Sequence, residues 1–133
     1  MIHIITDSSS DYDLTLAAQQ QVEIIPMRIC FGETEYLDRQ TISVADFYTK
    51  LEQADTLPST SQITPFQFCQ VFQPHIEAGD QIIGIFLSSE LSGTFQSAQA
   101  AKQILNTDNM TVFRHIYIFE RDDLIQYAGI VIQ

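Results

Sequence analysis

Hydroxyl-bearing side chains gather at three points of this sequence, and each point adjoins an apolar segment. The three groups are Asp7-Ser8-Ser9-Ser10, Thr60-Ser61, and Ser88-Ser89 together with Ser92-Gly93-Thr94. One such group would be ordinary helix capping, but three groups at equivalent ends of one sheet would place several neutral donors around one point. The pattern therefore predicts a site for a small anion.

The third group lies between a predicted strand and a predicted helix. Residues 81–87 form a near-continuous apolar run, which is typical of a strand covered on both faces in a parallel sheet. Apolar residues then recur at three- and four-residue steps, which predicts a helix over 93–105. Ser92 stands at the start of that helix, where unpaired N–H groups and the helix dipole favour an anion. The plainer interpretation is that Ser92 only caps the helix.

The other segments alternate between strand and helix patterns. We expect strands at 2–5, 22–30, 81–87 and 115–119, helices at 64–77 and 93–105, a polar hairpin or loop at 32–39, and a loop at 57–63. Alternation of this kind predicts an α/β fold with a parallel sheet of about four strands flanked by helices. In such a sheet, ligands bind beyond the carboxyl ends of the strands. We expect Ile4, Phe68, Ile83 and Ile85 to be buried in its core.

Length and composition limit the possible settings. A chain of 133 residues suits a single domain over 1–133. Six basic against 17 acidic residues give a net charge of −11, which would repel nucleic acid and anionic lipid, so we exclude both as partners. The sequence shows neither a signal peptide nor a run long enough to cross a membrane. Cys30 and Cys69 lack the spacing of a metal or redox motif, so we expect a soluble protein of the cytoplasm.

Catalytic and metal chemistry are less well supported. The corner Glu90-Leu91-Ser92-Gly93-Thr94 lacks the leading glycine of a serine-hydrolase elbow. His3, His75 and His115 are scattered, which predicts core or surface histidines and neither a triad base nor a zinc cluster. The segment 7–11 could hold a hard cation, but Asp11 serves equally well as a helix cap. We therefore expect no enzyme, no cofactor and no metal.

Three motifs in this order resemble the DegV family of bacterial fatty-acid-binding proteins. They are Thr6-Asp7-Ser8, Leu57-Pro58-Ser59-Thr60-Ser61-Gln62 and Leu87-Ser88-Ser89-Glu90-Leu91-Ser92-Gly93-Thr94-Phe95-Gln96-Ser97-Ala98. The resemblance covers residues 1–105 and implies the family's α/β N-terminal domain. It also implies that Thr60 and Ser92 bind a long-chain fatty acid by its carboxylate, while Ser61, Gly93, Asp7 and Ser8 shape the pocket. The family presents the bound lipid to a fatty-acid kinase.

The chain also departs from the family pattern. Family members are about twice as long, so the resemblance implies that the C-terminal domain, which encloses much of the acyl chain, is absent here. After residue 105 the sequence diverges and has Phe119-Glu120-Arg121-Asp122-Asp123 where the family has an Asp-Ser pair. A shortened domain leads to a second hypothesis, namely a structural module that binds no ligand and forms a homo-oligomer through the exposed apolar face.

Overall fold

Four parallel strands form the main sheet of the computed structural model, which describes residues 1–87, 89–105 and 116–120. The strand order is β2-β1-β6-β7, with β1 Ile2–Asp7, β2 Val22–Ile25, β6 Gln81–Phe86 and β7 Ile116–Glu120. β1 pairs in parallel with both β2 and β6, and β6 pairs in parallel with β7. The predicted α/β fold with a parallel sheet of about four strands is confirmed.

Helices connect these strands, as the sequence pattern predicts. They are the 3-10 helix η1 Ser8–Ser10 and the α-helices α1 Leu14–Gln20, α2 Val44–Gln53, α3 Pro65–Glu77 and α4 Thr94–Leu105. The start of α3 follows from its sequence, because Thr64 and Gln67 form a reciprocal capping box and Pro65 occupies the first turn. The helices predicted at 64–77 and 93–105 are thus confirmed to within one residue.

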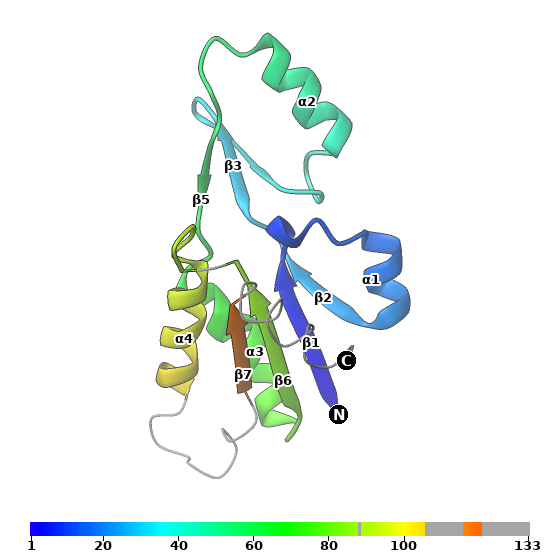
Figure 1. The fold of residues 1–133 in the computed structure, drawn as a ribbon, viewed down its shortest axis with the longest axis vertical. Helices are drawn as coiled ribbons and strands as arrows, with labels where there is room; N and C mark the ends of the chain where they lie inside the picture. Colours follow the sequence, from blue (N-terminus) through cyan, green and yellow to red (C-terminus); the bar gives the residue numbers. More distant parts are fainter. Residues whose placement is uncertain (88, 106–115, 121–133) are drawn as a thin grey trace, which may run out of the picture.

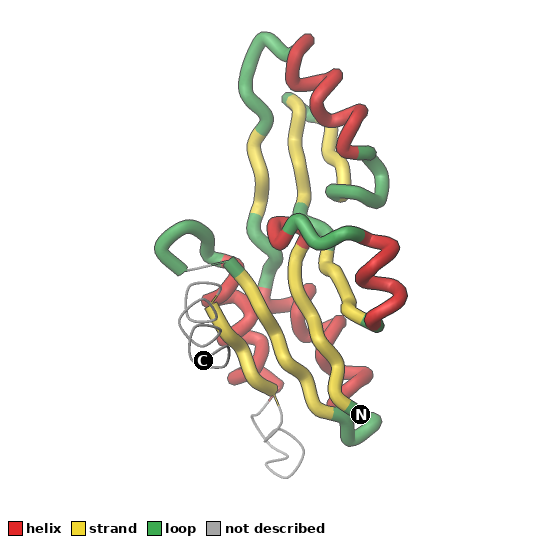
Figure 2. The backbone as a smooth tube through the Cα atoms, turned by 45° about the vertical axis from the view of Figure 1, so that its right-hand side comes forward, coloured by secondary structure: helices red, strands yellow, loops and turns green. Residues whose placement is uncertain are grey.

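A second, smaller sheet lies beyond the carboxyl ends of β1 and β6 (Figure 1). Its strands are β3 Arg28–Phe31, β4 Thr34–Leu37 and β5 Ser59–Ser61, in the order β4-β3-β5. Both pairings are antiparallel, and Gly32 with a φ of 58° forms the two-residue turn between β3 and β4. The predicted polar hairpin is therefore present, with α2 above it (Figure 2).

Two predicted boundaries are wrong in this region. The single strand expected at 22–30 is divided at Pro26 and Met27, so that β2 belongs to the main sheet and β3 to the small one. Proline lacks the N–H that would continue a ladder, which explains the break. The expected loop at 57–63 contains the short strand β5, because its backbone pairs with β3 from Arg28 to Cys30.

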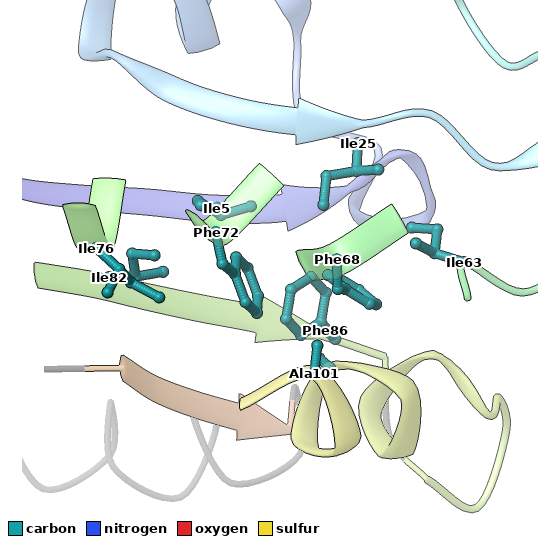
Figure 3. Packing of buried hydrophobic residues seen from close by; sticks show 10 residues of the cluster. Ile5, Ile25, Ile63, Phe68, Phe72, Ile76, Ile82, Phe86 and Ala101 are labelled. Atoms are coloured by element: carbon teal, nitrogen blue, oxygen red, sulfur yellow. The ribbon is translucent and has the colours of Figure 1, made fainter. Parts of the chain in front are cut away.

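The hydrophobic core lies between the main sheet and the helices α3 and α4 (Figure 3). Phe68 and Phe72 of α3 are fully buried against the sheet, and the ring of Phe68 meets that of Phe86 edge to face at 4.9 Å. The prediction for Phe68 is confirmed. The prediction for Ile4 is wrong, since it is exposed while its neighbour Ile5 is buried.

The predictions that Ile83 and Ile85 are buried are also wrong, because the buried residues of β6 are their immediate neighbours. Ile82 and Phe86 are buried, whereas Ile83 and Ile85 are only partly buried. Successive side chains of a strand point to opposite faces, and the core cluster occupies the face toward α3. A continuous apolar run does not reveal which of the two faces is the better covered. Within the described parts of the chain, no helix is both long and apolar enough to cross a bilayer.

Candidate functional site

The carboxyl end of β1 is a buried polar corner. Thr6 donates its hydroxyl hydrogen to the carbonyl oxygen of Ile85 at 2.7 Å, which joins β1 to β6 at this edge. The hydroxyl of Ser8 accepts the N–H of Met27 at 3.1 Å, which joins the corner to the segment that leads into the small sheet. Asp7 and Ser8 have only 1% and 2% of their surface exposed. Both residues therefore lie at the sheet edge where the sequence predicts them.

Asp7 is the acidic group of this corner. Its Oδ1 accepts the N–H of Ser9 at 2.8 Å and also the Ser9 hydroxyl, so the carboxylate caps η1. Burial raises the pKa of Asp7 above its ordinary value of 3.8, and the two bonds from Ser9 offset this only in part. A second anion beside it would raise the pKa further, because like charges disfavour ionisation. Both effects act in the same direction on the Asp7 carboxyl, toward its neutral form.

The corner between β6 and α4 holds Ser92 and Gly93. Ser92 accepts the N–H of Thr94 at 3.2 Å and donates to the Thr94 hydroxyl at 3.1 Å. The carbonyl of Gly93 accepts the N–H of Ser97 at 3.0 Å, so the first helical hydrogen bond begins at Gly93. The plainer interpretation of Ser92 as a residue that satisfies a helix N–H is therefore correct for this structure. Its partly exposed hydroxyl remains able to reorient toward a ligand.

Thr60 and Ser61 belong to β5, the edge strand of the small sheet. Thr60 pairs with Ile29, and Ser61 pairs with Arg28. Both hydroxyl-bearing residues are exposed. Pairing with β3 holds the backbone of this segment extended, so alternate residues such as Thr60 and Gln62 direct their side chains to the same side.

Gln62 joins the β5 segment to the helix corner. A methyl group placed on Gly93 would lie 1.8 Å from Oε1 of Gln62, so the Gln62 amide occupies the space that any other residue at 93 would fill. A larger residue at 93 would therefore require the exposed Gln62 side chain to move aside. The structure therefore brings the predicted Thr60-Ser61 and Ser92-Gly93 groups to one place. That Thr60 and Ser92 reach the same anion stays a prediction.

Two cavities adjoin this place. One, of about 30 Å³, is lined at the carboxyl ends of β1 and β6 by Thr6, Ser9, Ser10, Ile85, Phe86 and Leu87. It has room for one or two water molecules and is far too small for an acyl chain. The other, of about 420 Å³, is an open groove lined by Arg28, Ser61, Gln62, Thr64, Phe66, Gln67 and Gln70. Its polar lining and its arginine suit a charged head group better than a hydrocarbon.

Fold and site together define an α/β domain that gathers neutral donors at the carboxyl edge of a parallel sheet. The model of the family described as "Uncharacterised protein, DegV family" matches residues 1–119. This match covers most of the chain, and the chain therefore belongs to the DegV family, as its motifs predict.

Curated relatives and solved structures agree with this assignment. A DegV domain-containing protein of Clostridium perfringens is 40% identical over 111 residues, which are 84% of this chain and 40% of the relative. The crystal structure of a stearic acid-binding protein from Eubacterium ventriosum has a TM-score of 0.81 at 26% identity and covers 90% of this chain and 41% of its own. The crystal structure of DegV, a fatty acid binding protein from Bacillus subtilis, has a TM-score of 0.74 at 30% identity and covers 89% of this chain and 39% of its own. The chain spans about 40% of the length of these relatives.

Sequence reasoning missed two residues of this region. Gln62 stands inside the hydroxyl-rich motif, but nothing in the pattern indicates that its amide packs on Gly93. Arg28 lines the groove beside Ser61 because β3 and β5 pair, and that strand was not predicted. The segment Ser59-Thr60-Ser61 carries no strand signal of its own, because β5 is extended through its pairing with β3.

Proposed function

We propose that this chain binds a long-chain fatty acid by its carboxylate, with Thr60 and Ser92 as donors. The observation that supports the proposal is the close approach of the Gln62 side chain to Gly93, which places the β5 segment beside the helix corner. In this proposal Ser61 and Gly93 shape the site, and Asp7 and Ser8 form its floor at the end of β1. Two solved structures with this fold are described as binding fatty acids, which supports the choice of ligand.

The acyl chain requires an apolar enclosure beyond the carboxylate. Each buried methylene contributes about 0.8 kcal/mol, so a long chain left in water would forfeit most of the affinity. The cavity of about 30 Å³ at the sheet edge cannot supply this enclosure. We propose that the hydrocarbon leaves the corner between the two sheets and is covered by a further domain, as the family resemblance implies, or by a second copy of the chain.

The role that follows is that of a carrier without catalysis of its own. The carrier would hold the carboxylate of the lipid at the carboxyl edge of the main sheet and present it to a fatty-acid kinase that forms the acyl phosphate. This partner and a cytoplasmic location in a bacterial cell are parts of the proposal, which the DegV membership supports by resemblance.

Native mass spectrometry of the chain purified from bacterial cells tests the proposal. We expect a bound mass that corresponds to a fatty acid and that is released on denaturation. Titration of the delipidated chain with palmitate, followed by intrinsic tyrosine fluorescence and by melting temperature, should then restore the complex. A chain that purifies without lipid and shows no response to palmitate would refute fatty-acid binding by these residues.

One observation favours a second function, that of a module which associates with another chain. Leu57, Phe66 and Leu91 are 86%, 70% and 73% exposed, and large exposed apolar side chains can contribute to an association surface. The same mass spectra separate the two proposals, because a dimer without lipid supports the module and a lipid-loaded chain supports the carrier.

A further inference from the structure

Four residues with metal-binding side chains meet at the amino edge of the main sheet, opposite to the proposed lipid site. His3 is in β1, Glu23 in β2 and His75 in the last turn of α3, while Asp80 directly precedes β6. His3 points to the same face as the buried Ile5, two residues further along β1, and this face packs against α3. The fold therefore brings together histidines that are 72 positions apart in the sequence.

The end of α3 fixes two of these residues relative to each other. Gly79, with a φ of 78°, reverses the chain, and its N–H donates to the carbonyl of Ile76 at 2.9 Å. The N–H of Asp80 donates to the carbonyl of His75, also at 2.9 Å. These two bonds are the Schellman arrangement of a helix end. Asp80 and His75 are thereby held by backbone, independently of their side chains.

The side chains converge closely. The His3 and His75 rings stack with their centres 3.9 Å apart. Nε2 of His3 lies 2.9 Å from Oδ2 of Asp80, and Nε2 of His75 lies 3.1 Å from Oε2 of Glu23. One ligand atom from each of His3, His75 and Asp80 lies within 4.8 Å of the others. The Met1 amino group donates to the other oxygen of Asp80 and orients that carboxylate.

We propose that His3, His75 and Asp80 bind a divalent transition metal ion, and that Zn²⁺ is the ion they fit best. Two imidazoles and a carboxylate are a common protein ligand set for zinc, and a water molecule can supply the fourth ligand. Hard cations such as Mg²⁺ and Ca²⁺ prefer oxygen ligands alone and fit this set poorly. Glu23 orients the His75 ring from the side, in the manner of a carboxylate that accepts the other imidazole N–H.

The geometry needs only a small adjustment to accept the ion. Zinc bonds of 2.0–2.1 Å in a tetrahedron separate the ligand atoms by about 3.3 Å, and the present atoms lie within 4.8 Å of one another, so no pair must approach by more than roughly 1.5 Å. The side chains of His3, His75 and Asp80 are 23%, 22% and 21% exposed, which leaves them room for this rotation and leaves the ion a path of entry.

Electrostatics at this edge also favour a cation. The cluster lies at the carboxyl end of α3, a helix of 13 residues, where the helix dipole is negative. Two stacked imidazoles would repel each other if both were protonated, whereas a bound ion requires both to be neutral. The net charge of −11 attracts a divalent ion to the protein as a whole.

The test titrates the full chain, free of a histidine tag and stripped with chelator, with Zn²⁺ in competition with a chromophoric chelator. We expect one ion per chain and a rise in melting temperature that grows with zinc concentration. Co²⁺ should give the intense visible absorption of a tetrahedral site. Acidification should release the ion, because an imidazole must be neutral to bind a metal and protons therefore compete with Zn²⁺ for its ligands. Failure to bind Zn²⁺ at tens of micromolar would overturn the proposal.

Variants assign the ligands. His3→Gln or His75→Gln should each weaken Zn²⁺ binding by more than a hundredfold, and Glu23→Gln by about tenfold as an outer partner. Glu77→Gln is the matched control, because it removes a carboxylate from the same helix end that bonds to Gln73 outside the cluster. Melting curves in chelator verify that each variant folds. Zinc affinity unchanged in His3→Gln, or reduced equally by Glu77→Gln, would overturn the assignment. Palmitate binding has no part in these readouts, so failure of the lipid proposal leaves them unaffected.

Discussion

The two edges of the main sheet carry opposite kinds of chemistry. At the carboxyl edge, the buried Asp7 accepts the Ser9 hydroxyl, and the segments that hold Gln62 and Gly93 approach each other. At the amino edge, His3, His75 and Asp80 form a partly buried cluster, and the tight end of α3 fixes His75 and Asp80 relative to each other. The anion site that we propose thus depends on long connections between elements, whereas the cation site that we propose depends in part on a short one.

The acids at the two edges differ in the direction of their pKa. Burial raises that of Asp7, which accepts hydrogen bonds from the backbone and the hydroxyl of Ser9. Hydrogen bonds from the Met1 amino group and then from His3 lower that of Asp80. The surroundings of Asp7 therefore disfavour its charged form, and those of Asp80 favour it.

The largest effect is expected in the core that both edges share. Phe68→Ala should lower the free energy of unfolding by about 3–5 kcal/mol, because its fully buried ring meets Phe72 and Phe86. Phe66→Ala, two residues earlier and 70% exposed, is the control and should cost less than about 1 kcal/mol. Urea denaturation measures both. Equal losses would show that the helical face of α3 is wrongly assigned, and with it the position of His75.

The next effect concerns the carboxyl edge alone. Thr60→Val keeps the volume of the side chain but removes its donor, so palmitate affinity should fall about ten- to a hundredfold, as a bond to a charged group contributes roughly 1.5–3 kcal/mol. Thr34→Val, on the other edge strand of the same small sheet, is the matched control and should bind as the wild type does. Fluorescence titration with palmitate compares the two. Zinc affinity should be unchanged in both variants, which would confirm that the edges act independently.

The strands of the main sheet and the helices that cover it could be predicted because their signals are local. For example, the capping box at Thr64 and Gln67 and the apolar period of α4 indicate helices without reference to the rest of the chain. The groups at Asp7 and Ser92 could likewise be placed at one edge, because parallel strands end together. The prediction that Thr60 and Ser61 follow a strand of the same sheet is wrong, since they lie within β5 of the small antiparallel sheet. The pattern of β6 could not predict which alternate residues face the core. Ile82 and Ile83 are equally apolar, and only tertiary packing distinguishes the buried Ile82 from the partly buried Ile83.

The amino edge shows contacts that sequence reasoning did not provide. The sequence predicts scattered histidines, but the His3 and His75 rings lie 3.9 Å apart, because their proximity depends on the register of β1 with β6 and on the direction in which α3 returns. Strand β5 was missed for a related reason, since it is a strand only through its pairing with β3. Contacts between distant segments carry no local pattern, and both the candidate metal site and the closure of the lipid site consist of such contacts.

A smaller effect distinguishes capping from binding at Ser92. Ser92→Ala removes the acceptor of the Thr94 N–H and should lower the free energy of unfolding by about 1 kcal/mol. Ser43→Ala, which removes the equivalent bond to the N–H of Asp46 at the start of α2, should cost a similar amount. Palmitate affinity separates the two serines: it should fall only in Ser92→Ala. A loss of stability without a loss of affinity would leave Ser92 as a cap and remove it from the proposed site.

The smallest effect is a change in the pH dependence of stability, and its sign should differ between the edges. The folded-state pKa of Asp7 is raised above 3.8, so the stability of the wild type relative to Asp7→Asn should be greatest below pH 3.8 and decrease as the pH rises through the folded pKa. The folded-state pKa of Asp80 is lowered below 3.8, so the stability relative to Asp80→Asn should be present above pH 3.8 and decrease as the pH falls through the folded pKa. Urea unfolding of the three proteins between pH 3 and pH 7, in chelator and without lipid, measures both differences.

The other carboxylates cancel in each difference, because they are common to the wild type and the variant. The asparagine at position 7 can still accept the N–H of Ser9, so its difference reports the lost charge and not a lost cap. Slopes of the same sign at both positions would contradict the contrast between an edge built for an anion and an edge built for a cation.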